Sequence, residues 1–109
     1  MPAVARGNQT DSVASLTGTP VYKAGCSGPF KTTTNVCSPN VFCDGQGIVR
    51  LGDLITPHPT AICTIPDTSV LTTASSNVFV NGKGCGRLGD KYTADNTITT
   101  GSPNIFVNG

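Results

Sequence analysis

The chain has 109 residues, seven Lys or Arg against six acidic residues, and a formal net charge of +1 with histidine neutral. The length predicts one domain, residues 1–109, and the near-neutral charge leaves no basic footprint for nucleic acid or anionic lipid. The chain has no long apolar run for a membrane span, and its N-terminus lacks the layout of a signal peptide, so we expect a protein made in the cytosol.

The composition favours short strands joined by tight turns. Thirteen Gly and eight Pro disfavour helices, and we expect a core of Val, Ile, Leu and a few Phe. Five cysteines, an odd number without a secretion signal, argue against a disulfide framework and leave free thiols or metal ligands. A chain this small and this poor in large side chains is expected to need a staple, either a metal or a partner surface.

One sequence unit recurs along the chain. Residues 2–8, "PAVARGN", match the back half of the unit, and a long connection over 8–36, whose shape the sequence leaves open, follows. The full unit then reads "SPNVFCDGQGIVRLGD" over 38–53 and "SSNVFVNGKGCGRLGD" over 75–90, and its front half ends the chain as "SPNIFVNG" over 102–109. We therefore predict three repeats in cyclic permutation, the cores being 38–53, 75–90, and 102–109 completed by 2–8.

Each unit is predicted to form a β-hairpin. The alternation in "NVFV" is typical of a strand, and the Asp44-Gly45 and Asn81-Gly82 pairs are strong signals for a two-residue turn. The second strand ends at Gly-Asp (Gly52-Asp53 in one copy), where glycine accepts positive φ and the Asp side chain can bond the turn backbone. Three such hairpins bury little surface alone but can share one core around a common axis.

Three "SPNVF"-type segments in register with two "RLGD" copies resemble a family, the PAAR-repeat proteins, over nearly the whole chain. The run that gives the family its name is degenerate here, as "PAVAR" at 2–6, "GIVR" at 47–50 and "GCGR" at 84–87. Proteins of this family form the conical tip on the spike of contractile phage tails and type VI secretion systems. The resemblance implies an all-β fold in which three repeated β-hairpins with pseudo-threefold symmetry form a small cone.

The resemblance also implies a function, a partner and a location. The expected function is that of a non-enzymatic structural tip that caps and sharpens a trimeric β-helical spike, one monomer per trimer, and touches the target outer membrane transiently. The expected location is the phage virion tail tip, or the cytoplasm before delivery with a type VI secretion spike. The end of such a trimer exposes unpaired strand edges that a cap would cover. An alternative function is a metal-stapled adaptor that docks an effector or carrier onto the spike.

Tips of this family typically hold zinc through histidines and one cysteine from the loops between repeats. Cys26, His58 and Cys63 lie in the corresponding loops and are the candidate ligands, since thiolate and imidazole are the usual zinc donors. The chain departs from the family pattern because it has only one histidine. The fourth ligand stays open between Cys37, an Asp and water, and a surface-loop role for His58 is the alternative.

The remaining signals favour structure over chemistry. Cys37, Cys43 and Cys85 replace small or apolar residues of the other copies, which favours plain packing. Arg50 with Asp53, and the equivalent pair in the next copy, predict a turn bond or a contact with the spike. The "GKGCG" run at 82–86 lacks the Ser or Thr and the helix of a phosphate loop. A Cys–His nucleophile pair has no third residue to orient it.

Overall fold

The computed structural model describes residues 1–15, 30–56, 70–93 and 96–107. This part of the chain contains no helix, and therefore none that could span a membrane. The predicted all-β class is confirmed. The strands are β1 (Ser12–Ser15), β2 (Phe30–Thr33), β3 (Phe42–Cys43), β4 (Gln46–Gly47), β5 (Phe79–Val80), β6 (Lys83–Gly84), β7 (Lys91–Tyr92) and β8 (Asn96–Ile98).

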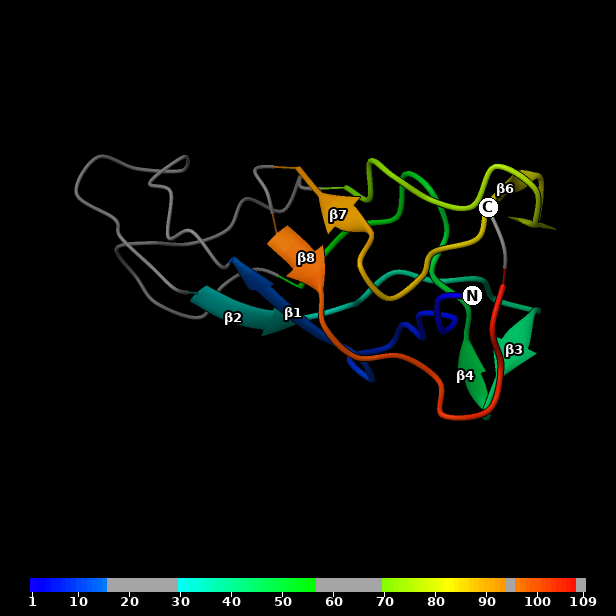
Figure 1. The fold of residues 1–109 in the computed structure, drawn as a ribbon, viewed down its shortest axis with the longest axis horizontal. Coiled ribbons are helices and arrows are strands. Elements are labelled where there is room, and N and C mark those ends of the chain that lie inside the picture. The colour runs from blue at the N-terminus through cyan, green and yellow to red at the C-terminus, as the bar shows by residue number, and fades with distance from the viewer. Residues whose placement is uncertain (16–29, 57–69, 94–95, 108–109) are drawn as a thin grey trace.

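Two of the predicted hairpins are present as antiparallel strand pairs at one end of the molecule, β3 with β4 and β5 with β6 (Figure 1). Both central turn residues have positive φ, 54° and 80° at Asp44-Gly45 and 53° and 77° at Asn81-Gly82. These angles define a type I′ turn, whose twist matches that of the flanking strands. Asn and Asp tolerate the left-handed conformation better than other side chains, and Gly adopts it freely. The turn prediction is therefore confirmed at these two pairs, and the Asn-Gly pair at 108–109, which gives the same sequence signal, lies outside the described residues.

The N-terminal and C-terminal segments pair in the register of the two hairpins. Ala3 forms an antiparallel bridge with Phe106, as Gly47 does with Phe42. The Val4 amide donates to the Ile105 carbonyl at 2.9 Å, just as the amide of the corresponding residue in each complete copy bonds its own front half. Residues from the two ends of the sequence thus share one strand pairing.

The second strands of the three copies are bonded to one another in a closed cycle. The Val49 amide donates to the Ala5 carbonyl at 3.1 Å, the Ala5 amide to the Gly86 carbonyl at 3.0 Å, and the Gly86 amide to the Val49 carbonyl at 2.7 Å. Each of these residues immediately precedes the arginine of its copy. A cycle of buried backbone bonds satisfies donors and acceptors that would be costly to leave unpaired.

Beyond the hairpins lies a sheet in the order β2-β1-β8-β7 (Figure 1). Three further antiparallel bridges connect its outer strands into a ring: Leu71 with Tyr92, Leu54 with Val70, and Thr34 with Ile55. Six segments therefore close a small barrel, which leaves the four-stranded sheet without an open lateral edge. The sequence pattern predicts only connections at these segments, because their alternation is too short to stand out.

Two buried clusters form the core. The cluster inside the barrel contains Ala5, Val13, Val49, Ile55, Leu71, Tyr92 and Ile98. The second cluster lies beneath the hairpins and contains Val4, Cys43, Ile48, Val80 and Cys85. Burial of each medium-sized apolar side chain contributes about 1.5–3 kcal/mol. All three copies contribute to the second cluster, so no copy has a core of its own.

Candidate docking face

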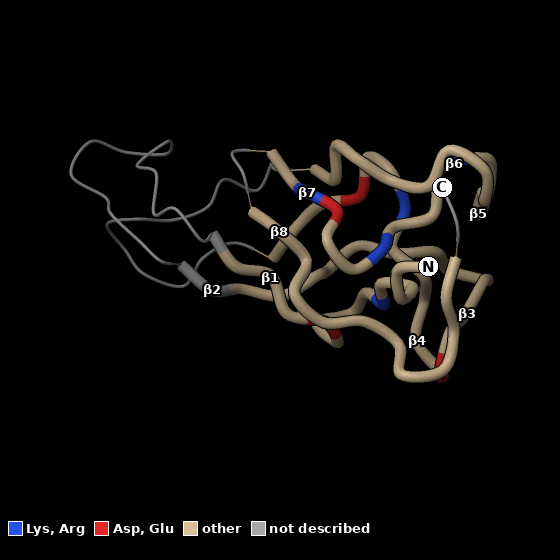
Figure 2. The backbone as a smooth tube through the Cα atoms, in the orientation of Figure 1, with Lys and Arg blue, Asp and Glu red and all other residues tan. Residues whose placement is uncertain are grey.

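Each copy of the repeat carries an Arg–Asp turn with the same hydrogen bonds. Asp53 Oδ2 accepts from the Arg50 amide at 2.8 Å and from Nε at 2.9 Å, and its Oδ1 accepts from Nη2 at 3.0 Å. Asp90 accepts the same three bonds from Arg87 at 2.8, 3.0 and 3.0 Å. The predicted turn bond is confirmed. Figure 2 shows blue (Lys or Arg) and red (Asp or Glu) segments close together in the body of the molecule.

A third Arg–Asp turn, which the sequence pattern does not predict, joins Arg6 to Asp11. The Arg6 amide, Nε and Nη2 bond the Asp11 carboxylate at 2.6, 3.1 and 2.8 Å. The separation is five residues here and three in the other copies, because the turn "GNQTD" is longer than "LGD". Asn8 and Gln9 both adopt positive φ to accommodate the extra length. The inserted residues hid the equivalence.

Three phenylalanines at the same position of the three copies are exposed to solvent. Phe42 is 60 % exposed, Phe79 61 % and Phe106 46 %. The expectation that Phe contributes to the core is therefore wrong for these residues. The physical reason is the strand alternation: Val80 points inward and is buried, so its neighbour Phe79 points outward. We call Phe42, Phe79 and Phe106 the phenylalanine triplet.

Further apolar side chains of the repeats are exposed as well. Val41 and Ile105, each preceding a phenylalanine of the triplet, are also exposed, as are Leu51 and Leu88, each following the arginine of its copy. Single exposed apolar side chains are common on soluble proteins, but a repeated aromatic at equivalent positions is not explained by chance. Aromatic residues are enriched at protein interfaces, where they contribute large contact areas. The triplet is the candidate docking face.

The cysteines of the described chain are packed thiols. Cys43 and Cys85 are buried in the core cluster beneath the hairpins, in agreement with the prediction. Burial raises the pKa of Cys85 to about 11 and also raises the pKa of Cys43. Both thiols are therefore protonated at neutral pH, which makes them poor nucleophiles and poor metal ligands. Cys37 is half-buried, and desolvation likewise raises its pKa.

The predicted metal ligands Cys26, His58 and Cys63 lie outside the described residues. Within the described ranges, no three His, Cys, Asp or Glu side chains gather closely enough to hold a metal ion. Cys37, the candidate fourth ligand, packs against the backbone of Gly7 and Gly47.

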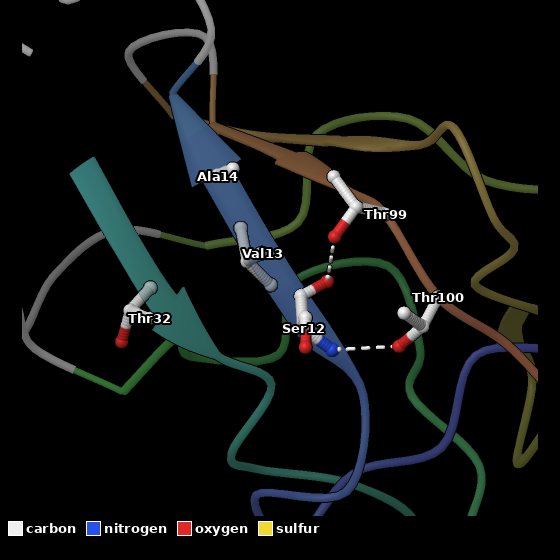
Figure 3. A pocket seen from close by; sticks show the side chains of 6 residues that line it. All are labelled: Ser12, Val13, Ala14, Thr32, Thr99 and Thr100. Carbon is white, nitrogen blue, oxygen red and sulfur yellow. Dashed lines mark hydrogen bonds between the residues drawn. The ribbon is translucent and has the colours of Figure 1, made fainter. Parts of the chain in front are cut away.

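A hollow of about 220 Å³ lies against β1 and is lined by Ser12, Val13, Ala14, Thr32, Thr99 and Thr100 (Figure 3). Its polar groups are largely engaged with the backbone: the Ser12 amide donates to Thr100 Oγ1 at 2.8 Å, and Thr99 Oγ1 donates to the Ser12 carbonyl at 3.2 Å. No titratable side chain lines it. The hollow therefore supplies neither an acid nor a base for catalysis.

No protein-family model matches the chain, and no curated protein is significantly similar to it.

Proposed function

We propose that the protein is the tip that caps the trimeric β-helical spike of a contractile injection machine, in a phage tail or a type VI secretion system. The observation that carries the proposal is the phenylalanine triplet, one exposed aromatic from each copy of the repeat. The PAAR-like repeat sequence adds independent support. A monomer that presents the same side chain three times suits a partner that presents the same socket three times.

In this proposal, the three repeats are related by a pseudo-threefold axis that coincides with the axis of the spike. The closed cycle of bonds between Ala5, Val49 and Gly86 supports such an axis, because each copy donates to one neighbour and accepts from the other. Each repeat would then face one spike protomer, and one chain would cap one trimer. The cap would cover the strand edges that are exposed at the blunt end of the trimer.

The proposed work of the protein is mechanical rather than catalytic. The barrel is closed laterally, and an Arg–Asp ion pair stabilises one turn in each of the three repeats. Such cross-linking suits a body that must pass through an outer membrane without deforming. The protein would reside at the tip of the virion tail, or in the cytoplasm before delivery with a secretion spike.

The docking prediction is tested with the trimeric β-helical spike protein encoded in the same genome. Mixing the two proteins and measuring mass by light scattering is expected to give one chain per trimer. Replacing all three members of the triplet by serine is expected to weaken binding at least about a hundredfold, since buried aromatic anchors contribute about 2 kcal/mol or more each. Leu54→Ser, at an exposed apolar residue on the barrel, is the matched control. Equal binding by the triple variant would contradict the proposal.

We further expect about one zinc ion per chain, held by Cys26, His58 and Cys63. Elemental analysis of the purified protein should find this zinc, and His58→Ala should lower its content. If the wild-type protein contains no metal, the zinc prediction is wrong, but the docking proposal is unaffected. The buried thiols Cys43 and Cys85 provide the control: Cys43→Val, which copies Val80, should leave the zinc content unchanged.

A further inference from the structure

The turn residue of one repeat is held by side chains of another repeat. Asp44, at the tip of the β3–β4 hairpin, accepts a hydrogen bond from Ser102 Oγ at 2.6 Å. Arg6 Nη1 lies 3.3 Å and Asn104 Nδ2 3.4 Å from the same carboxylate. All three donors belong to the copy formed by the two ends of the sequence. The Ser102 hydroxyl, with the help of Asn104 and Arg6, holds the pKa of Asp44 below its ordinary value.

The same arrangement recurs at the tip of the β5–β6 hairpin. Asn81 Oδ1 accepts from Ser38 Oγ at 2.6 Å and from Arg50 Nη1 at 3.3 Å. Asn81 Nδ2 donates to Asn40 Oδ1 at 2.9 Å. Ser38, Asn40 and Arg50 occupy the same repeat positions as the three residues around Asp44, but the residue they hold is neutral. We call each set a turn clamp: Ser102, Asn104, Arg6 and Asp44 in one, Ser38, Asn40, Arg50 and Asn81 in the other.

The serine of each clamp has both local and distant partners. Ser38 Oγ accepts from the Val41 amide at 2.9 Å, and Ser102 Oγ accepts from the Ile105 amide at 3.0 Å. The hydroxyl hydrogen is then directed to the turn residue of the other copy. Each serine therefore ties the start of its own copy, just before the exposed phenylalanine, to the hairpin tip of another copy.

The clamps bear directly on the phenylalanine triplet. Phe42 lies two residues before Asp44, and Phe79 lies two residues before Asn81. A hairpin with only two residues in each strand has little stability of its own, so its tip needs external support to hold one position. The clamp supplies that support from the repeat next to it.

We propose that Ser38 and Ser102, together with Arg50 and Arg6, are positioning residues that fix the distance between the phenylalanine hairpins of different repeats. The inference rests on the proposed docking function. Its physical basis is preorganisation: a rigid set of anchors loses less conformational entropy on binding than three hairpins that move separately. The clamps make the triplet one surface rather than three independent contacts.

The chain itself supplies matched variants, because one clamp uses Asp and the other Asn. Asp44→Asn gives the first clamp the turn residue of the second, and Asn81→Asp does the reverse. Each exchange should preserve its clamp, because the side-chain amide of Asn104 or Asn40 can rotate by 180° to match the new donor or acceptor. Asp44→Gly and Asn81→Gly remove the held side chain. Glycine is suited to these positions, where φ is 54° and 53°, so the loss is confined to the clamp.

The first measurement is hydrogen–deuterium exchange on the free full-length chain. The reporters are the amides of Ile48 and Cys85, which donate to Val41 and Val78 within the two hairpins. We expect about tenfold faster exchange at Ile48 in Asp44→Gly and at Cys85 in Asn81→Gly, the loss of a hydrogen bond or two. The Asp–Asn exchanges should stay within about twofold of wild type. Unchanged exchange in both glycine variants would overturn the clamp.

The second measurement is the dissociation constant for the trimeric β-helical spike protein. The glycine variants should bind about tenfold more weakly than wild type, whereas the Asp–Asn exchanges should bind normally. The Leu71 amide, bonded to the Asp53 carbonyl in the barrel, reports that the fold is intact. If wild type binds and the glycine variants bind equally well despite faster hairpin exchange, the positioning role is wrong and docking stands. If wild type does not bind, both the docking function and the positioning role fail.

Discussion

Asp53→Ala is expected to lower the free energy of unfolding by about 3–5 kcal/mol, because it leaves a largely buried guanidinium without its carboxylate. The side chains of Arg50 and Asp53 are 13 % and 3 % exposed, and the Asp53 carboxylate accepts two hydrogen bonds from the guanidinium and one from the Arg50 amide. After the substitution, Arg50 would keep only its longer contacts, to the Cys37 carbonyl at 3.4 Å and to Asn81 at 3.3 Å. The free energy of unfolding of a domain is about 5–15 kcal/mol in total, so the expected loss is a large fraction of it.

Urea denaturation of the wild-type and variant chains measures this loss. Asp90→Ala provides a replicate, since its three bonds to Arg87 match those of Asp53. Asp44→Asn provides a control at an exposed carboxylate, where we expect little change. If Asp53→Ala and Asp90→Ala each cost less than about 1 kcal/mol, the Arg–Asp turns do not stabilise the fold as described here.

Gly47→Ala is the second substitution with a large expected effect. A Cβ at this position would lie 2.3 Å from the Ser38 carbonyl oxygen and 2.6 Å from Cys37 Sγ, closer than atoms can approach. Overpacking in a close-packed site costs about 1–3 kcal/mol and sometimes more, and here the nearest atom is backbone. We therefore expect a loss of about 3 kcal/mol or more. Gly84→Ala, with contacts of 2.8 and 3.0 Å, should cost less.

The third copy of the repeat suggests a rescue for Gly47→Ala. In that copy the larger side chain is at the other position of the pair: Ala3 takes the place of Gly47, and Gly101 takes the place of Cys37. A Cβ on Gly101 would lie 2.8 Å from Ala3 Cβ. Only one residue of this pair can therefore carry a Cβ atom without a steric clash. The double variant Cys37→Gly with Gly47→Ala should recover part of the lost stability in thermal and urea unfolding. No recovery would show that the Ser38 carbonyl alone sets the cost.

The sequence predicts the hairpins well because their signals are local. The angles at Asp44-Gly45 and Asn81-Gly82 follow from residue types that tolerate positive φ, and the Arg–Asp bonds follow from a fixed spacing of three residues. The Arg6–Asp11 turn escaped prediction because two inserted residues change that spacing. The residue types alone do not predict that Asn8 and Gln9 both adopt positive φ, which accommodates the longer turn.

The barrel and the candidate docking face depend on long-range pairing, which local patterns do not encode. β1 pairs with β8 across more than eighty residues of sequence, and bridges of single residues such as Leu54 with Val70 complete the ring. The outward position of Phe79 follows from the alternation once Val80 is known to be buried. A phenylalanine in a small apolar strand is ordinarily assigned to the core, and the strand direction decides otherwise. The predicted metal ligands lie outside the described residues and stay a prediction.

The strand bridge between Ala3 and Phe106 has a consequence for how the protein folds. The bonds around Ala5 likewise need Val49 and Gly86 in place, so residues early in the sequence find their partners far along it. Chains dominated by such distant contacts fold slowly, since a large loop-closure entropy is lost before the contacts form. During synthesis, the apolar residues of early segments therefore stay uncovered until their distant partners have emerged, and at this stage the protein is prone to aggregate.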